Sequence, residues 1–197
     1  ANILMVRYNY EERGQYAVLL KPRTDSRDGE RKIQSRMGLS ASAEYVDEFL
    51  KEISTIWKKE NTEYRYQGKK VDAVLVDEAQ FLSEAEIDTL SDLVDFYNIP
   101  VICYGLRTDF RNRLFPGSRR LMEIADVIEE VPTVCWCGKR AQCNTRYANG
   151  EIVREGAQIM LGSNESYVAL CRKHYKEGKL WKENGVKKQI ATGENHE

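Results

Sequence analysis

The run Val71–Val76 constrains the fold more than any other part of this sequence. It is apolar except for Asp72, and such a run is typical of a strand buried on both faces in the middle of a parallel sheet. A sheet of this kind needs helices over both of its faces. Two acidic residues, Asp77 and Glu78, follow the run directly. The run therefore predicts an α/β protein with two carboxylates at the C-terminal end of a central strand.

Strand-like and helix-like patterns alternate up to residue 131. Ser83 and Glu86 form a capping box, in which each side chain satisfies a backbone N–H of the other, and the helix that begins there stops before Pro100. Such alternation is typical of a doubly wound parallel sheet. Polar residues 23–42 are predicted to form a long surface loop. The predicted strands are 16–20, 71–76, 101–104 and 127–131, and the predicted helices are 1–13, 46–57, 83–99 and 117–125.

Charge and hydropathy exclude several classes of partner. The chain has 30 Lys and Arg against 31 Asp and Glu, so its formal net charge is −1. No global bias attracts nucleic acid or an anionic membrane. No apolar run approaches the roughly 20 residues of a membrane span, and the N-terminus does not have the pattern of a signal peptide. We expect a cytoplasmic protein that binds neither nucleic acid nor membrane.

The acidic pair at the strand end points to phosphoryl transfer. Ligands of open parallel sheets bind beyond the C-terminal ends of the strands. In P-loop enzymes an Asp at this place holds Mg²⁺, and an adjacent Glu can accept the proton of the attacking hydroxyl. The sequence Asp77-Glu78-Ala79-Gln80 also fits the acidic box of a helicase-like ATPase. The alternative is that the pair has no functional role and consists of two exposed acids at the start of a turn.

Cysteines and a histidine near the C-terminus form two close pairs. Cys135 and Cys137 make one pair, and Cys171 and His174 make the other. Thiolate and imidazole ligands in two pairs suit a tetrahedral structural zinc. The alternative is buried thiols beside a surface histidine. Of the other cysteines, Cys103 is expected in the core, whereas Cys143 could compete as a ligand, because Cys-x-Cys is tighter than the usual zinc spacing.

The residue pattern changes beyond Pro132, where glycines and cysteines are frequent and long helical patterns are missing. We expect an α/β nucleotide-binding domain over 1–132 and a zinc-binding lobe over 133–178. Residues 179–197 are polar, and a mobile tail is the default for such an end.

Several stretches, in the same order along most of the chain, resemble the thymidine kinase family of bacteria and of the animal cytosol. Together they are highly specific. They are Val76–Leu82, Tyr104–Phe110, Phe115–Ser118, the paired cysteines, and Leu161–Tyr167 leading into Cys171–His174.

The resemblance implies a P-loop-type (RecA-like) parallel sheet flanked by helices, plus a small zinc-binding lobe with a lasso-like loop. It implies a kinase that moves the γ-phosphate of ATP to the 5′-hydroxyl of thymidine with the help of Mg²⁺. Such enzymes are usually homotetramers, and their end product dTTP inhibits them. A nucleotide-salvage role follows from the same resemblance.

The resemblance also assigns roles around the nucleotide. Glu78 matches the catalytic base, and Asp77 matches the acid on the magnesium side. Ala79 and Gln80 lie beside the nucleotide in this comparison. A polar pair, Asp25 and Arg27, matches residues near the phosphates, where the planar fork of an arginine offers paired donors.

The nucleoside side is assigned in the same way. Without the resemblance, core packing or half-buried loop positions would account for these aromatic residues. Phe81, Leu106 and Phe110 match apolar walls of the nucleoside pocket. The lasso that closes over the base is matched by Gln158, Ile159, Met160, Leu161, Gly162 and Tyr167.

One departure concerns the phosphate-binding loop of the family, a glycine-rich turn that ends in Gly-Lys-Ser or Gly-Lys-Thr. It should come immediately before the helix that starts at Ala1, after a first strand, and neither is in the sequence. Our expectation is that the sequence begins just after this loop. Intact mass and N-terminal sequencing would test that expectation.

Two other functional classes stay open at this stage. A helicase-like or other mechanical ATPase would suit the acidic box, but the near-neutral charge and the short chain argue against two motor lobes. A non-catalytic zinc module that binds protein or nucleic acid is favoured if the phosphate loop is truly absent.

Overall fold

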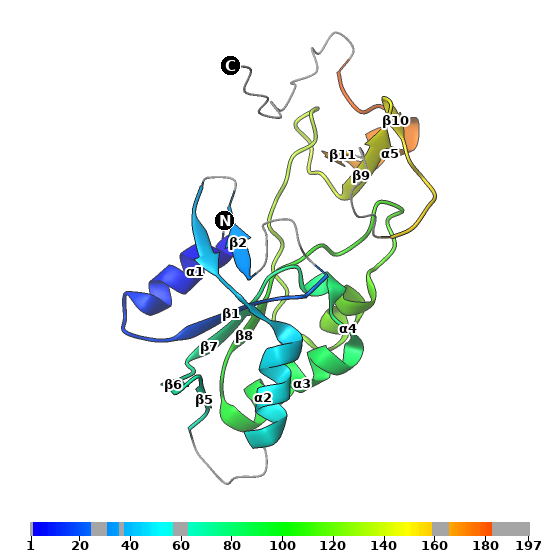
Figure 1. Cartoon of the computed structure of the whole chain (residues 1–197). Coiled ribbons are helices and arrows are strands. Elements are labelled where there is room, and N and C mark those ends of the chain that lie inside the picture. Colours follow the sequence, from blue (N-terminus) through cyan, green and yellow to red (C-terminus); the bar gives the residue numbers. More distant parts are fainter. Residues whose placement is uncertain (1, 25–30, 36–37, 57–62, 159–165, 183–197) are drawn as a thin grey trace, which may run out of the picture. The chain divides into compact units, whose positions relative to one another are not determined.

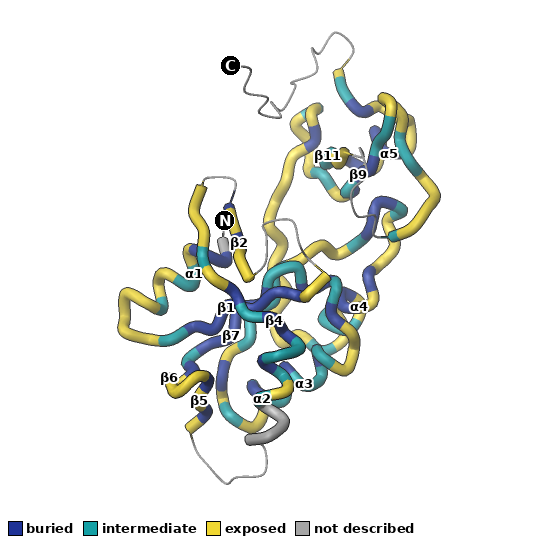
Figure 2. Tube along the Cα trace, viewed as in Figure 1, coloured by how far each residue is buried: buried dark blue, intermediate teal, exposed yellow. Residues whose placement is uncertain are grey.

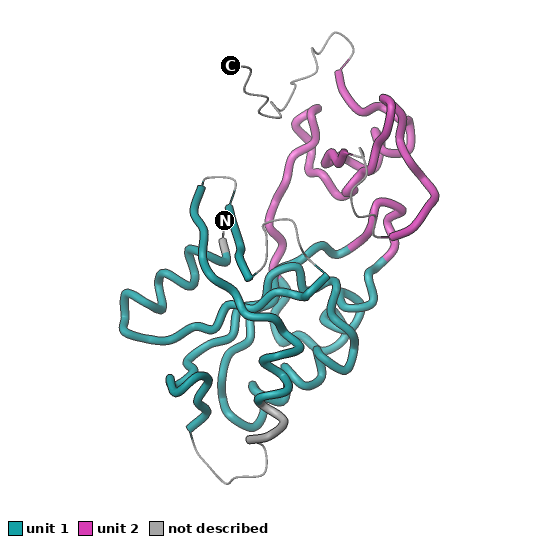
Figure 3. Tube along the Cα trace, viewed as in Figure 1, with its two compact units in different colours: residues 1–107, 114–128 teal, residues 108–113, 129–197 magenta. Residues whose placement is uncertain are grey.

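The computed structural model describes residues 2–24, 31–35, 38–56, 63–158 and 166–182. The chain forms two compact units (Figure 3). The core unit contains residues 1–107 and 114–128, and the small unit contains residues 108–113 and 129–197. The short segment 108–113 thus belongs with the C-terminal part of the chain. The domain limits expected at residues 132 and 178 stay predictions.

A four-stranded sheet lies in the core unit (Figure 1). Its order is β4 (Glu44–Tyr45), β1 (Ala17–Lys21), β7 (Ala73–Val76) and β8 (Val101–Cys103), and neighbouring strands are parallel. All residues of β1 and β7 are buried, as Figure 2 shows. The parallel sheet predicted from the apolar run is therefore present, and β7 is one of its two inner strands.

Alternate residues of the inner strands supply two separate cores, because successive side chains of a strand point to opposite faces. Ile3 and Leu4 of α1 (Asn2–Glu11) belong to the cluster that contains Leu19 and Leu75. The opposite cluster joins residues of β1 and β7 to α2 (Val46–Ile56) and α3 (Glu84–Tyr97). Its members include Val18, Leu20, Val46, Phe49, Val74, Val76, Ile87 and Leu90.

Helix α3 begins and ends where its sequence predicts. Ser83 and Glu86 form the expected capping box, and each side chain bonds the backbone N–H of the other. At the other end, Asn98 has a left-handed backbone with φ 53°, and its N–H bonds the carbonyls of Leu93 and Val94. Pro100 cannot continue the helix because it has no N–H. These local signals set where α3 begins and ends.

The strand predicted at 127–131 is wrong. The chain leaves α4 (Pro116–Ile124) without regular structure, and Val127, Ile128 and Val131 are 74%, 62% and 64% exposed. A strand needs a hydrogen-bonding neighbour, and no described strand pairs with this segment. An apolar pattern without a ladder partner does not make a strand.

One hairpin lies in the segment 23–42, which we predicted to be a loop, and a second hairpin was not predicted. Within 23–42, β2 (Lys32–Gln34) pairs with β3 (Ser40–Ser42), and Ile33 packs into the α1 side of the core. Strands β5 (Arg65–Tyr66) and β6 (Lys69–Lys70) form the second hairpin. In each hairpin only one strand has a buried side chain, which is too weak a pattern to detect.

The small unit is built on a three-stranded antiparallel sheet. Its order is β10 (Glu151–Ile152), β9 (Cys143–Ala148) and β11 (Ser166–Leu170). Helix α5 (Arg172–Glu177) follows β11 and ends at Gly178, whose φ of 74° is easily reached only without a side chain. The buried core of the small unit consists of Cys135, Cys143, Leu170, Cys171, Tyr175 and Leu180. No described helix is long and apolar enough to cross a membrane.

Candidate functional site

Glu78 stands just beyond the C-terminal end of β7 and caps the short helix η1 (Ala79–Phe81). Its backbone is left-handed, with φ 51° and ψ 37°. This conformation is unfavourable for a residue with a side chain and is kept only where the surroundings enforce it. Here the N–H of Ala79 bonds the carbonyl of Tyr104 at 2.9 Å, and the N–H of Asp77 bonds the carbonyl of Leu20 at 2.9 Å. The two neighbouring strands thus hold the turn in place.

The side chain of Gln80 fixes the carboxylate of Glu78. Gln80 is buried, its Nε2 donates to Glu78 Oε2 at 2.5 Å, and its Oε1 accepts from the N–H of Leu106 at 3.1 Å. One amide therefore joins the end of β7 to the loop after β8. An amide between a carboxylate and a backbone N–H has a single orientation that satisfies both. The carboxylate of Glu78 is held in a defined position.

The N-terminus of α4 closes against the η1 turn. A Cβ on Gly117 would lie 2.6 to 2.8 Å from the carbonyl oxygens of Ala79, Leu82 and Gln80. No side chain fits there. Ser118 adds a hydrogen bond from its Oγ to the carbonyl of Leu106 at 2.6 Å. Helix α4 therefore supports the turn that carries Glu78.

Two of the predicted nucleoside walls lie in the core unit. Phe81 packs edge-on against Phe115, with ring centroids 5.6 Å apart and an interplanar angle of 85°. Leu106 is 40% exposed, and Gln80 joins its backbone N–H to the carboxylate of Glu78. An exposed leucine beside a fixed carboxylate is suited to contact a ligand.

The other predicted nucleoside residues lie in the small unit. Phe110 is buried, Tyr167 is half exposed, and Gln158 Nε2 donates to Asp109 Oδ2 at 3.2 Å. Burial opposes ionisation of Asp109, but donors from the Arg113 backbone and from the Arg111 side chain and backbone outweigh it, so the pKa of Asp109 lies below its ordinary value. Six other predicted site residues fall outside the described residues: Asp25, Arg27, Ile159, Met160, Leu161 and Gly162.

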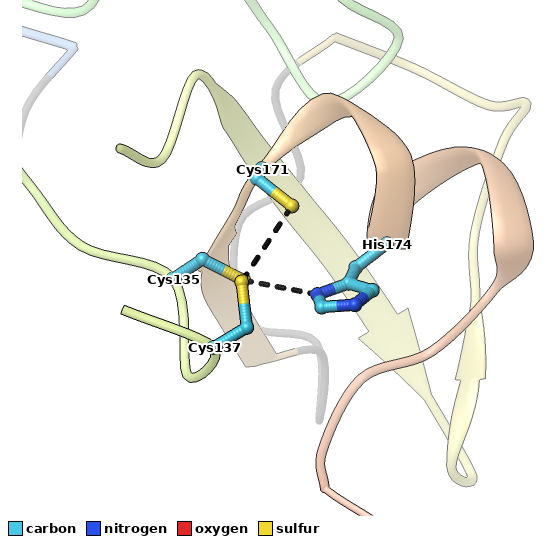
Figure 4. A group of neighbouring side chains, drawn as sticks. All are labelled: Cys135, Cys137, Cys171 and His174. Carbon is cyan, nitrogen blue, oxygen red and sulfur yellow. Dashed lines mark hydrogen bonds between the residues drawn. The ribbon is translucent and has the colours of Figure 1, made fainter. Parts of the chain in front are cut away.

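The four predicted zinc ligands come together in the small unit. Their ligand atoms all lie within 4.8 Å of one another (Figure 4). Cys135 Sγ is 3.3 Å from His174 Nδ1, and Cys137 Sγ is 4.0 Å from Cys171 Sγ. A tetrahedral zinc with bonds of about 2.3 Å to sulfur and about 2.0 Å to nitrogen separates its ligand atoms by roughly 3.5–3.8 Å. The set fits a zinc ion in number, chemistry and spacing.

Local structure explains why these four side chains meet. Cys135 and Cys137 lie on one turn, which the N–H of Gly138 closes onto the carbonyl of Cys135 at 2.8 Å. Cys171 is the N-cap of α5, and His174 follows one turn later on the same helix. The nearby backbone N–H of His174 lowers the pKa of the Cys171 thiol, which favours the thiolate that binds metal.

The other two cysteines take no part in this cluster. Cys143 lies in β9 and packs in the core of the small unit, so the cluster does not use it as a competing ligand. Cys103 packs against the core of the sheet, as expected, and desolvation of its thiol raises the pKa to about 12 although the residue keeps some exposure. A thiol of this kind is unreactive at neutral pH.

Known proteins resemble this chain over nearly its whole length. The family model described as thymidine kinase matches residues 1–175. A thymidine kinase of Haemophilus influenzae is 46% identical over 176 residues, which is 89% of this chain and 88% of that protein. One from Legionella pneumophila is 44% identical over 91% of this chain and 84% of its own length, and one from Idiomarina loihiensis is 42% identical over 89% of each.

This chain belongs to the thymidine kinase family. The resemblance found in the sequence motifs is thereby confirmed. Membership in the thymidine kinase family identifies the chain as a kinase. The helicase-like and non-catalytic alternatives are not favoured.

Sequence reasoning missed two residues of this family member. Trp136 stacks on the His174 ring with centroids 4.0 Å apart and 7° between the planes, and its Nε1 donates to the carbonyl of Lys179 at 3.2 Å. Arg146 is fully buried in β9. The position of Trp136 between two ligands was a signal for the first. Nothing in the sequence around Arg146 signalled its burial.

Replacing Gly117 with alanine is expected to destabilise the protein by about 1–3 kcal/mol, as overpacking in a closed site does. The added Cβ meets three backbone carbonyls, which cannot rotate away as a side chain could. Urea unfolding measures the loss. Arg119→Ala, an exposed neighbour on α4 with an ion pair to Glu123, is the matched control and should change stability by less than about 0.5 kcal/mol. Equal stabilities of the two variants would contradict the close packing.

Proposed function

We propose that this member of the thymidine kinase family transfers the γ-phosphate of ATP to the 5′-hydroxyl of thymidine, giving dTMP and ADP. The observation that carries the proposal is the carboxylate of Glu78, held by Gln80 at the end of an inner strand. The family relationship supplies the reaction, and this carboxylate supplies a group suited to it.

The proposed chemistry assigns one proton transfer to the protein. Glu78 accepts the proton of the 5′-hydroxyl while that oxygen attacks the γ-phosphorus and ADP leaves. A fixed carboxylate avoids the cost of orienting it during the reaction. Ala79 and Gln80 lie beside the nucleotide in this proposal, with Asp25 and Arg27 near its phosphates.

Two metal ions belong to the proposal. Asp77 and Glu78 offer carboxylate oxygens, the ligand type that Mg²⁺ prefers, and the bound ion would offset negative charge on the phosphates. Zinc held by Cys135, Cys137 and Cys171 with His174 would have a structural role, since all four positions of a tetrahedral ion are filled by protein.

The nucleoside contacts are proposed residue by residue. Phe81 and Leu106 act as apolar walls. Phe110 and Tyr167 offer rings to the base, together with the segment 158–162. Family resemblance further supports a cytoplasmic homotetramer inhibited by dTTP. Cross-linking or light scattering tests the oligomeric state, and an assay at increasing dTTP tests the inhibition.

The full-length protein, given magnesium-ATP and each deoxynucleoside in turn, is expected to phosphorylate thymidine best. Formation of dTMP, followed by chromatography of labelled nucleoside, measures this. The matched control is ATP without nucleoside, with and without added nucleic acid. ATP hydrolysis stimulated by nucleic acid, without any dTMP, would instead support a motor ATPase and overturn the proposal.

A further inference from the structure

Arg146 is a fully buried arginine inside the small unit. It lies in β9 with 0% exposure and is the largest of the fully buried side chains among the described residues. Each of its three guanidinium nitrogens donates a hydrogen bond to a different residue. Nε bonds the Tyr167 hydroxyl at 2.9 Å, Nη1 bonds the carbonyl of Ala157 at 2.9 Å, and Nη2 bonds the carbonyl of Gln158 at 3.2 Å.

The face of the same guanidinium covers an aromatic ring. Arg146 Cζ lies 3.8 Å from the ring centroid of Phe110 and 5.5 Å from that of Tyr167. A planar cation over a ring is attracted by the π electrons while its edge still donates hydrogen bonds. One side chain therefore contacts both rings that the proposed function assigns to the base.

Neighbouring bonds hold the same group of residues from other sides. The hydroxyl of Tyr175 donates to the carbonyl of Phe110 at 3.0 Å, so the backbone of Phe110 is fixed from α5. Gln158, whose carbonyl accepts from Arg146, also donates to Asp109, the residue before Phe110. Arg146 is the central member of a network that ties segments 109–110, 157–158 and 167 together.

From these contacts we infer that Arg146 is a positioning residue for nucleoside binding, which sets the Phe110 and Tyr167 rings relative to each other before the base arrives. This inference rests on the proposed function. A preformed pair of rings loses less freedom on binding and so binds a pyrimidine more tightly. Arginine is required because its planar fork donates in three directions while its flat face covers Phe110; a lysine ammonium has no such face.

The test is steady-state kinetics of the full-length enzyme with Arg146→Lys. The KM for thymidine should rise at least about tenfold while the KM for ATP stays within about twofold, because the residue acts on one substrate only. Arg140→Lys is the matched control. That arginine is exposed and forms an ion pair with Glu130 that a lysine can keep, so its thymidine KM should not change.

Tyr167→Phe gives a second, milder test, since it removes only the hydroxyl that accepts from Nε. Its thymidine KM should rise about threefold, and the double variant should behave like Arg146→Lys alone, because coupled residues are not additive. Independent, additive effects would overturn the inference. So would an active Arg146→Lys enzyme with an unchanged thymidine KM, or one whose KM values for both substrates rise together. A wild-type enzyme that makes no dTMP would instead overturn the proposed function.

Discussion

Glu78→Gln is expected to lower kcat for thymidine phosphorylation by about a thousandfold, within the range that a positioned general base contributes. The substitution keeps the shape of the side chain and an oxygen that can accept from Gln80 Nε2, so the local geometry is preserved. It removes the group that takes up the proton of the 5′-hydroxyl. Because binding does not need that proton transfer, KM for thymidine should change little. Initial rates over a range of thymidine concentrations measure both constants.

The control for this prediction is Glu84→Gln. Glu84 is an exposed glutamate in the first turn of α3, close in sequence to Glu78 but beyond the turn that Gln80 and Gly117 enclose. Its replacement should leave kcat within about twofold of the wild type, as surface changes do. A Glu78→Gln enzyme that keeps more than about a tenth of the wild-type kcat would show that another group takes the proton.

Cys171→Ser is expected to abolish stable zinc binding and to lower the melting temperature by roughly 10 °C or more, since binding of a structural zinc is linked to folding. Serine is a favoured N-cap residue, so the start of α5 at this position should not be disturbed. What is lost is a thiolate ligand in a cluster whose atoms lie within 4.8 Å of one another. Metal analysis should find about one zinc per wild-type chain and almost none in the variant.

Cys143→Ala separates loss of zinc from loss of a buried thiol. Cys143 is buried in the same core as the ligands but is not among them. The variant should keep its zinc, with only the modest loss of stability that a smaller core side chain causes. Zinc retained in Cys171→Ser, or lost in Cys143→Ala, would contradict the proposed ligand set.

Local signals were sufficient for the central elements of the core unit. The apolar run that ends at Val76 predicted β7, because a strand buried on both faces leaves no position for polar residues. The capping box at Ser83 and Glu86 predicted the start of α3 in the same way, since its hydrogen bonds join residues close in sequence. The Cys and His residues of the candidate metal cluster could be predicted because each pair lies within one turn of chain.

Pairing between strands that lie far apart in the sequence could not be predicted from local patterns. Residues 127–131 have a strand-like pattern but no partner in the described sheet, and their side chains are exposed. The opposite error occurred around Ile33, where a largely polar segment forms a hairpin whose strands bury this one side chain. A strand forms only beside a hydrogen-bonding partner strand, and the tertiary fold determines which segments become partners.

Taken alone, the sequence determined the α/β class, the acidic pair after β7, the two pairs of Cys and His residues that could hold a metal, and the family, because each depends on residue type at short spacing. Tertiary structure alone decided how the acidic pair is held: Gln80 bonds Glu78 and, across the fold, the backbone of Leu106, while Gly117 allows α4 to approach. It also decided that Arg146, which stands in a largely polar stretch, is buried over Phe110. Hydrogen bonds and ring contacts of this kind join residues far apart in the chain, so no local pattern encodes them.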